Sequence, residues 1–236
     1  MSDNVYDGII IGGGHNGLIL QAYAGLAGLK CLCLERRPET GGGLTTVEDP
    51  RQPGFFHNTH AFFQRAITDM PWYRDLALED QGLVFIEPEL NVALLTRDER
   101  SLQWWTDFQK TFDSFAEFDR QDAQALKDWH DKFHPIVEKY LRPENFSPPL
   151  KKEERRELLK RTPDGRLLLE TSELSPLEFV HKYFRHPTIQ AGLLFFNGLR
   201  EVDLRIRGFG HHIPSLLAQP SKAQMSVNGS KALAQA

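Results

Sequence analysis

A run of glycines near the start of the chain constrains its fold more than any other feature. Gly12, Gly14 and Gly17 follow the β-branched stretch 5–11 and open the apolar stretch 18–27. A strand, a glycine turn and a helix in this order are the setting in which a G-x-G-x-x-G motif binds a dinucleotide. Gly12 permits a tight turn, Gly14 lets the backbone approach a pyrophosphate, and Gly17 lets the helix lie close to the strand. The sequence therefore predicts a buried strand followed by a helix whose positive end receives the phosphates.

An acidic residue stands where such a motif needs one. The stretch 29–34 predicts the next strand, and Glu35 closes it, 18 residues after Gly17. A carboxylate at this point accepts hydrogen bonds from ribose hydroxyls and disfavours a 2′-phosphate, so the sequence argues against an NADP site. The alternative is an ordinary solvated strand end, which the strand–helix–strand context disfavours.

Composition sets broad limits on the class of protein. The 236 residues suffice for one large or two small domains, and a net charge of −4 gives no electrostatic reason to expect a nucleic-acid partner. The first residues lack a signal-peptide pattern, and no apolar run is long enough for a transmembrane segment. We therefore expect a cytoplasmic protein, either free or peripheral to a membrane. Cys31 and Cys33 share one face of a strand, which favours core packing over a redox pair.

The middle of the chain predicts a second region made of a small sheet and helices. After a mainly irregular stretch, 41–58, the segments 83–86, 90–95 and 101–105 predict strands, the last two joined as a hairpin. Residues 151–161 form a charge-dense helical pattern, which indicates a solvated surface helix. This second region would be inserted after the first nucleotide-binding unit.

Further helices are predicted by their caps and apolar periodicity. Asp119 has the character of an N-cap for a helix that Pro135 would kink. Ser175 followed by Pro176 predicts another helix start, and an apolar helix is expected from about 188 to 196.

Four phenylalanines recur at helical spacing before this region. Phe108, Phe112, Phe115 and Phe118 are separated by three or four residues, which places their rings on one stripe. A core face is the favoured interpretation, and a substrate-lining surface is the alternative.

A second glycine cluster extends the predicted site. Glu35 and Arg36 lead into Gly41, Gly42 and Gly43. A chain that crosses close to a pyrophosphate needs positions without a Cβ, and a second glycine loop supplies further N–H donors. The alternative is a flexible turn between a strand and a loop, which the spacing from Glu35 disfavours.

Together these blocks resemble FAD-binding enzymes of the amine oxidase and phytoene desaturase superfamily. The resemblance rests on residues 12–17, 35–43 and 53–58, and more loosely on 115–123. It is strongest to the phytoene-dehydrogenase-like branch, which includes the pyridine nucleotide-disulfide oxidoreductase domain-containing 2 proteins. The implied fold is α/β, with a Rossmann-like FAD-binding βαβ unit and an inserted α+β substrate domain.

The resemblance also implies how the chain is divided. Residues 1–62 would form the N-terminal part of the FAD-binding domain, 63–224 the inserted substrate domain, and 225–236 the start of the return to the FAD-binding domain. In relatives, further strands and a C-terminal glycine motif complete the flavin site. We therefore expect this chain to be one part of an enzyme, completed by a C-terminal portion or by a second polypeptide.

The implied cofactor is FAD. The positions that match the family's cofactor-binding motifs are Gly12, Gly14, His15, Asn16, Gly17, Glu35, Arg36, Gly41, Gly42, Gly43 and Leu44. His57, Asn58 and His60 are further candidates for lining the site, with ordinary surface positions as the alternative. The sequence does not identify catalytic residues.

Two departures from the family pattern stand out. Gly43 occupies the position at which amine oxidases and many carotene desaturases have an arginine, which leaves phosphate neutralisation to the backbone and Arg36. Gln21 stands where the first helix of the family usually has a small residue. The departure at Gly43 weakens a substrate assignment by analogy with amine oxidases.

No metal site is predicted. His130 and His134 have the spacing of metal ligands on a helix but lack the glutamate and third ligand of a zinc helix. An ordinary helix face is the favoured interpretation.

The resemblance implies an oxidoreductase of the desaturase or dehydrogenase type. The reaction would be hydride transfer between a carbon of an apolar or conjugated small-molecule substrate and flavin N5. A flavin amine oxidase is one alternative. A non-catalytic accessory protein that binds a nucleotide and needs a partner chain is the other.

Overall fold

The chain forms two compact units. The computed structural model describes residues 5–198, 203–219 and 223–236. The N-terminal unit comprises Met1–Pro88 and Lys222–Ala236, and the helical unit comprises Glu89–Ser221. The compact first unit includes residues 63–88, because several of these residues share a small core with Leu44 and Leu233.

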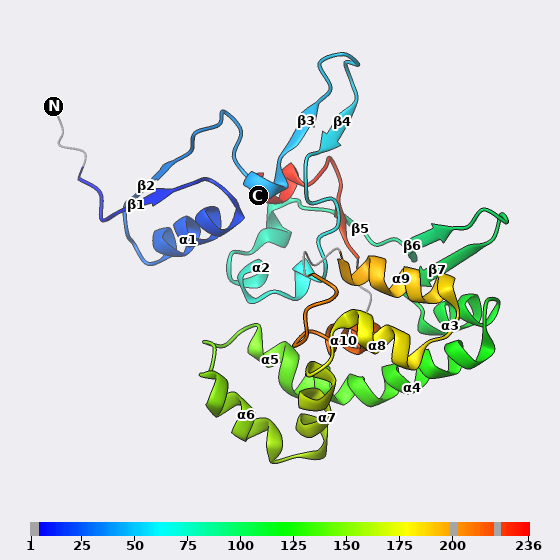
Figure 1. The fold of residues 1–236 in the computed structure, drawn as a ribbon. Helices are drawn as coiled ribbons and strands as arrows, with labels where there is room; N and C mark the ends of the chain where they lie inside the picture. Colours follow the sequence, from blue (N-terminus) through cyan, green and yellow to red (C-terminus); the bar gives the residue numbers. More distant parts are fainter. Residues whose placement is uncertain (1–4, 199–202, 220–222) are drawn as a thin grey trace. The chain divides into compact units, whose positions relative to one another are not determined.

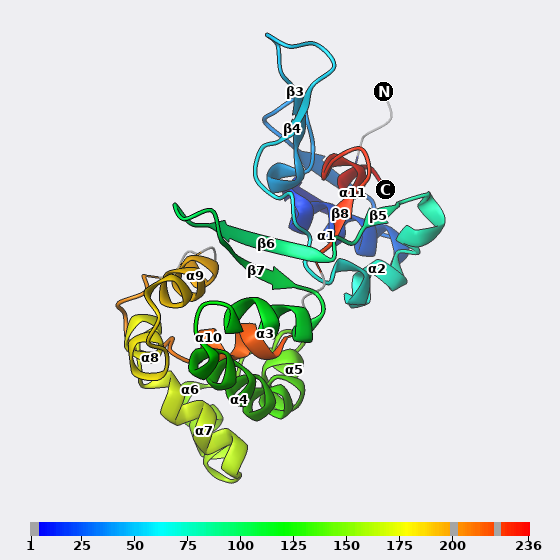
Figure 2. The same cartoon turned by 90° about the vertical axis from the view of Figure 1, so that its right-hand side faces the viewer.

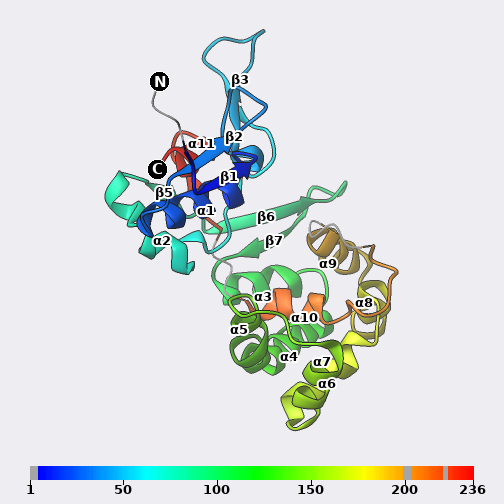
Figure 3. The same cartoon turned by 90° about the vertical axis from the view of Figure 1, so that its left-hand side faces the viewer.

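The N-terminal unit begins with the predicted βαβ arrangement. Strand β1 (Gly8–Ile11) pairs in parallel with β2 (Cys31–Leu34), and α1 (His15–Leu26) connects them, as Figure 3 shows. The remaining elements of this unit are β3 (Thr46–Glu48), β4 (Phe56–Asn58), α2 (Pro71–Asp75), β5 (Phe85–Ile86), β8 (Met225–Ser226) and α11 (Lys231–Gln235).

Two pairings in this unit were not predicted. Strands β3 and β4 form an antiparallel hairpin (Figure 1) within the stretch expected to be mainly irregular. Strand β5 pairs antiparallel with β8, which brings the last residues of the chain back to the first unit. Backbone hydrogen bonds between partners far apart in sequence leave no local pattern, and the β3–β4 strands are too short to show a clear alternation.

The helical unit combines a hairpin with a set of packed helices. Strands β6 (Leu90–Leu95) and β7 (Ser101–Trp105) form the predicted hairpin, which lies beside α3 in Figure 2. The helices are α3 (Phe108–Ala116), α4 (Arg120–Ile136), α5 (Arg142–Glu144), α6 (Lys152–Lys160), α7 (Pro163–Ser172), α8 (Pro176–Tyr183), α9 (Pro187–Gly198) and α10 (His212–Ala218).

Side-chain caps explain where several of these helices begin. The Asp119 carboxylate accepts hydrogen bonds from the N–H groups of Gln121 and Asp122, as predicted for the N-cap of α4. Ser175 and Glu178 form a reciprocal capping box at the start of α8. Pro135 lies near the end of α4, which passes into a π-helical turn at Val137–Leu141.

The helical unit has a continuous apolar core. Phe115 is fully buried, and Phe108, Phe112 and Phe118 are partly buried and pack against the same core, which confirms the core interpretation of this stripe. Aromatic edges meet faces inside it: the rings of Trp129 and Phe179 lie 4.8 Å apart at 62°. The helices and the hairpin of this unit therefore share one hydrophobic core.

The β1–β2 pair is less buried than predicted. Ile9 is 63% exposed and Ile11 is 88% exposed, and α1 has no buried residue. Ile10 lies on the other face, against α1, where its side chain would be 3.3 Å from a Cβ at Gly17. The expectation of a buried strand was therefore wrong here, because among the described residues β1 and β2 pair only with each other.

The described helices give no candidate for a membrane span. None of the helices in residues 5–198, 203–219 and 223–236 combines the length and the apolar character needed to cross a bilayer.

The buried carboxylate of Asp122 joins the start of α4 to the segment before α9. It accepts backbone hydrogen bonds from Arg185 at 2.9 Å and from His186 at 2.8 Å, just before α9 begins. Asp122→Asn keeps the volume but places an amide group where these N–H donors converge. We expect the free energy of unfolding to fall by about 1.5–3 kcal/mol, measured by urea denaturation. Asp128→Asn, at an exposed position of the same helix, is the control; equal effects of the two changes would contradict this role.

Candidate nucleotide-binding site

The first glycine turn has the geometry that its sequence predicts. Gly12 has φ = +102°, a backbone conformation that favours glycine, and its N–H donates to the Leu34 carbonyl at 2.8 Å. A Cβ on Gly17 would lie 2.1 Å from the carbonyl oxygen of Gly12. Glycine at 17 therefore allows α1 to start directly against the turn that ends β1.

Among the residues that the structure describes, no side chain caps the N-terminus of α1. Its N-cap is Gly14, which has no side chain to accept a hydrogen bond, and no acidic residue lies in the first turn. The first N–H groups of a helix have no intrahelical partner and carry a partial positive charge. His15 and Asn16 are exposed at this end. This end of α1 therefore suits an anion such as a phosphate group.

Glu35 ties the end of β2 to the glycine turn. Its Oε2 accepts the Gly13 N–H at 2.7 Å, and its Oε1 accepts the Arg37 N–H at 2.9 Å. These hydrogen bonds, from Arg37 first and then Gly13, hold the pKa of Glu35 below its ordinary value. The carboxylate is thus ionised and oriented beside the turn, with lone pairs left for hydroxyl donors.

The two glycine loops meet backbone to backbone. The Gly41 N–H donates to the Gly13 carbonyl at 2.7 Å, and Gly14 and Gly41 form a parallel bridge. Gly41 and Gly42 have φ of +110° and +57°, and a Cβ on Gly42 would lie 3.0 Å from the Gly14 Cα. The predicted residues of both loops are therefore brought together.

Gly13 is a site residue that the motif alone did not indicate. It is buried, it donates to Glu35, and its carbonyl accepts from Gly41. A Cβ at this position would lie 3.3 Å from the Cβ of Glu35. In G-x-G-x-x-G the position of Gly13 is a variable one, so only the presence of three consecutive glycines could have suggested its role.

Leu44 and Arg36 lie differently from the glycines. The Leu44 side chain is buried in the small core with Tyr73, Leu78 and Leu233, so its side chain serves packing. Arg36 is exposed next to Glu35. Any contact of these two residues with a cofactor stays a prediction.

The departure at Gly43 has a structural counterpart. A Cβ on Gly43 would lie 3.3 Å from the ring of His60, and the Gly43 carbonyl accepts the Ala61 N–H at 3.0 Å. A side chain at residue 43 would therefore contact the exposed His60 ring, which would have to shift slightly.

The other two candidates after the glycine loops have different surroundings. The Oδ1 atom of Asn58 accepts from the Thr46 hydroxyl at 2.8 Å and from the Ser230 N–H at 2.9 Å. Ser230 in turn donates its hydroxyl to the Leu44 carbonyl at 3.0 Å. His57 lies on β4 and is exposed, 3.9 Å from the Asp49 carboxylate. Asn58 therefore holds the returning segment against the second glycine loop, which the sequence did not indicate.

An apolar cavity of about 660 Å³ lies within the N-terminal unit, beside the second glycine loop. Its wall includes His15, Gly43 and His60, which connects it to the glycine loops. Most of the other lining residues are apolar, including Leu18, Ile19 and Leu26 of α1, Trp72 of α2 and Leu233 of α11. A cavity of this size and character suits an organic molecule with few polar groups.

Comparison with known proteins supports this interpretation of the first unit. Residues 10–76 match the family described as NAD(P)-binding Rossmann-like domain. The chain is 30% identical over 228 residues to a limonene dehydrogenase subunit of Castellaniella defragrans, covering 96% of this chain and 41% of that protein. It is 32% identical over 139 residues to pyridine nucleotide-disulfide oxidoreductase domain-containing protein 2 of Rattus norvegicus, covering 56% of this chain and 23% of that protein.

Solved structures show the same fold at low sequence identity. A putrescine oxidase variant matches with a TM-score of 0.56 at 14% identity, covering 98% of this chain and 48% of the other. A RAB GDI from Plasmodium falciparum matches with a TM-score of 0.57 at 13% identity, covering 98% and 54%. These likenesses concern the fold alone, since one fold carries different functions.

The predicted resemblance and fold class are confirmed. The chain has a mixed helix and sheet fold with a Rossmann-like unit, and it is similar to the oxidoreductase-domain protein that the sequence motifs indicated. The chain spans less than half the length of these two relatives.

Two glycines of α1 offer a matched pair for testing the turn. Gly17→Ala places a methyl group against the Gly12 carbonyl, whereas nothing lies within 4 Å of a Cβ at Gly25. We expect Gly17→Ala to lower the free energy of unfolding of the N-terminal unit by about 3 kcal/mol. Gly25→Ala should raise it by about 0.5–1 kcal/mol. Urea unfolding followed through the NMR signal of the Trp72 indole measures both, and a Gly17→Ala protein as stable as Gly25→Ala would refute the close approach.

Proposed function

We propose that this chain provides the nucleotide-binding part of an FAD-dependent oxidoreductase of the dehydrogenase or desaturase type. The observation that carries the proposal is the open N-terminus of α1, flanked by two glycine loops in contact and by an oriented Glu35. The similarity to a limonene dehydrogenase component and to an oxidoreductase-domain protein supports the redox assignment.

The residues fit the ADP half of FAD. The pyrophosphate would accept hydrogen bonds from the N–H groups in the first turn of α1, which itself contains no acidic residue. Gly41 and Gly42 would bring a second backbone segment close to the phosphates, since neither has a side chain in the way. Glu35 would accept hydrogen bonds from the ribose hydroxyls, and its charge would repel a 2′-phosphate.

When FAD is bound, it supplies a hydride acceptor at N5, and the chain's own residues bind and orient it. The substrate would be an apolar or conjugated small molecule. Its support is the largely apolar cavity beside Gly43 and His60, whose walls would contact a bound hydrocarbon. A relative named for limonene, a hydrocarbon, supports the same substrate class.

Further polypeptide would complete the flavin half of the site. The outer faces of β1 and α1 expose large apolar side chains, including Ile9, Ile11 and Leu20. Such a patch on a Rossmann-like unit is the kind of surface that further strands and helices cover. Because the chain spans 41% of the limonene dehydrogenase relative, we propose that a C-terminal portion or a second polypeptide covers these faces.

Binding of nucleotides to the chain tests the cofactor assignment. We expect isothermal titration calorimetry to detect FAD and ADP, with 2′-phospho-ADP bound at least about tenfold more weakly than ADP because of repulsion from Glu35. Glu35→Gln should weaken ADP binding by about tenfold through loss of a charged acceptor. Glu39→Gln, at an exposed position of the same loop, is the control. Preferred binding of the 2′-phosphorylated nucleotide would overturn the assignment.

Reduction of the flavin tests the reaction class. The FAD-loaded protein, purified with any chain that accompanies it, is mixed with limonene in the absence of air. We expect loss of absorbance near 450 nm, because hydride transfer reduces the flavin. Putrescine serves as the matched amine probe and should leave the absorbance unchanged. Bleaching by putrescine with hydrogen peroxide formed under air would favour the amine oxidase alternative, and no bleaching by either would favour the accessory role.

A further inference from the structure

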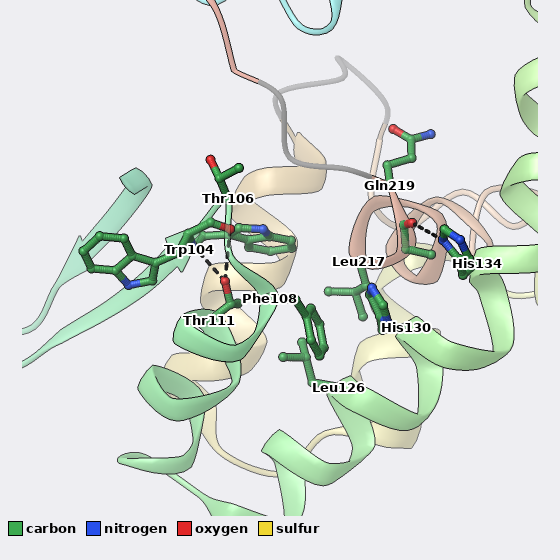
Figure 4. Close-up of a pocket in the computed structure, with 11 residues that line it drawn as sticks. Trp104, Thr106, Phe108, Thr111, Leu126, His130, His134, Leu217 and Gln219 are labelled. Carbon is green, nitrogen blue, oxygen red and sulfur yellow. Dashed lines mark hydrogen bonds between the residues drawn. The ribbon is translucent and has the colours of Figure 1, made fainter. Parts of the chain in front are cut away.

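The helical unit contains a hollow of its own. A cavity of about 260 Å³ lies between β7, α3, α4 and α10, as shown in Figure 4. Trp104 and Phe108 line it with aromatic rings, and Leu126 and Leu217 add aliphatic surface. These walls favour the hydrocarbon part of a ligand.

Two histidines from successive turns of α4 also line this hollow. His130 and His134 stand at its edge in Figure 4. The Nδ1 atom of His130 lies 3.0 Å from a carboxylate oxygen of Asp131, and the Nδ1 atom of His134 lies 3.4 Å from the carbonyl oxygen of Ala218. Both partners accept hydrogen bonds, so each Nδ1 carries the hydrogen. In a neutral imidazole of this tautomer, Nε2 is an acceptor.

Neighbouring residues hold the His130 ring in place and form hydrogen bonds with the Thr111 hydroxyl. The ring of His130 stacks on Phe108, with centroids 3.9 Å apart at 29°. Thr111, also in the wall, already accepts the Trp105 N–H at 2.9 Å and lies 3.2 Å from the Trp105 carbonyl. Each histidine therefore keeps an Nε2 atom that can accept a hydrogen bond. The hollow combines apolar side chains with these histidines and with Thr106, Thr111 and Gln219. Apolar surface with several polar groups is usual in small-molecule sites.

We propose that this hollow binds a small, mainly apolar organic molecule that carries one hydroxyl donor, such as an alkyl-substituted phenol. Its ring would lie against Trp104 and Phe108, and its hydroxyl would donate to Nε2 of His130 or His134. A dry cavity of about 150 Å³ admits benzene, so about 260 Å³ suits a ring with short substituents, about ten non-hydrogen atoms. The site lies entirely in the helical unit and goes beyond the function proposed for the nucleotide site.

Two probes of the same shape separate the hydroxyl from the hydrocarbon. The full chain is titrated with 4-isopropylphenol and with 4-isopropyltoluene, in which a methyl group replaces the hydroxyl. The indole N–H signal of Trp104 reports this hollow, whereas that of Trp72 reports the cavity of the N-terminal unit. We expect both probes to shift the Trp104 signal, with the phenol bound about tenfold more tightly. No shift of this signal with either probe, up to the solubility limit of the probe, would overturn the proposal.

Substitution of the acceptors completes the test. His130→Phe and His134→Phe, singly and together, keep a ring but remove Nε2, and His181→Phe on α8 is the exposed control. In the double variant the preference for the phenol should fall to about onefold while 4-isopropyltoluene still binds. A preference unchanged in the double variant, or equally reduced in His181→Phe, would overturn the assignment. If circular dichroism shows that the double variant does not fold, the two single variants decide. If both single variants keep the full preference for the phenol, the proposal is overturned.

Discussion

The N-terminal unit depends on one contact, the meeting of two glycine loops through their backbones. Gly41 donates to the Gly13 carbonyl, and Gly13 donates to Glu35, each at 2.7 Å. Side chains would separate the loops, because a Cβ on Gly42 would already lie 3.0 Å from the Gly14 Cα. This contact fixes the end of β2 and the second loop around the open end of α1. The proposed pyrophosphate and ribose contacts all follow from that arrangement.

The two units differ in how far they bury their apolar residues. The helical unit encloses Phe115, Phe133 and Phe179 completely. In the N-terminal unit, β1 and α1 keep large apolar side chains exposed, although their glycine contacts are tight. The glycine turn between β1 and α1 is therefore tightly packed, while the face of β1 that carries Ile9 and Ile11 is exposed. Covering that face is the physical reason for proposing further polypeptide, and it explains how a well-formed phosphate site can precede a complete flavin site.

The predictions that were confirmed depend on patterns among residues close together in the sequence. The βαβ unit, the β6–β7 hairpin and the caps at Asp119 and Ser175 each depend on neighbouring residues, so they could be inferred from sequence. Pairing of β5 with β8 joins segments about 140 residues apart, and a two-residue strand has no periodicity. The roles of Gly13 and of Ser230 in the site were missed for the same reason, since each depends on a distant partner.

We infer that both glycine loops and Glu35 form one nucleotide site. Titration of the isotope-labelled chain with ADP, followed through backbone amide signals, tests this inference. We expect the largest shifts at residues 12–17, 35 and 41–43, with the amides of the helical unit unchanged. Shifts confined to the first loop, or centred in the helical unit, would contradict it.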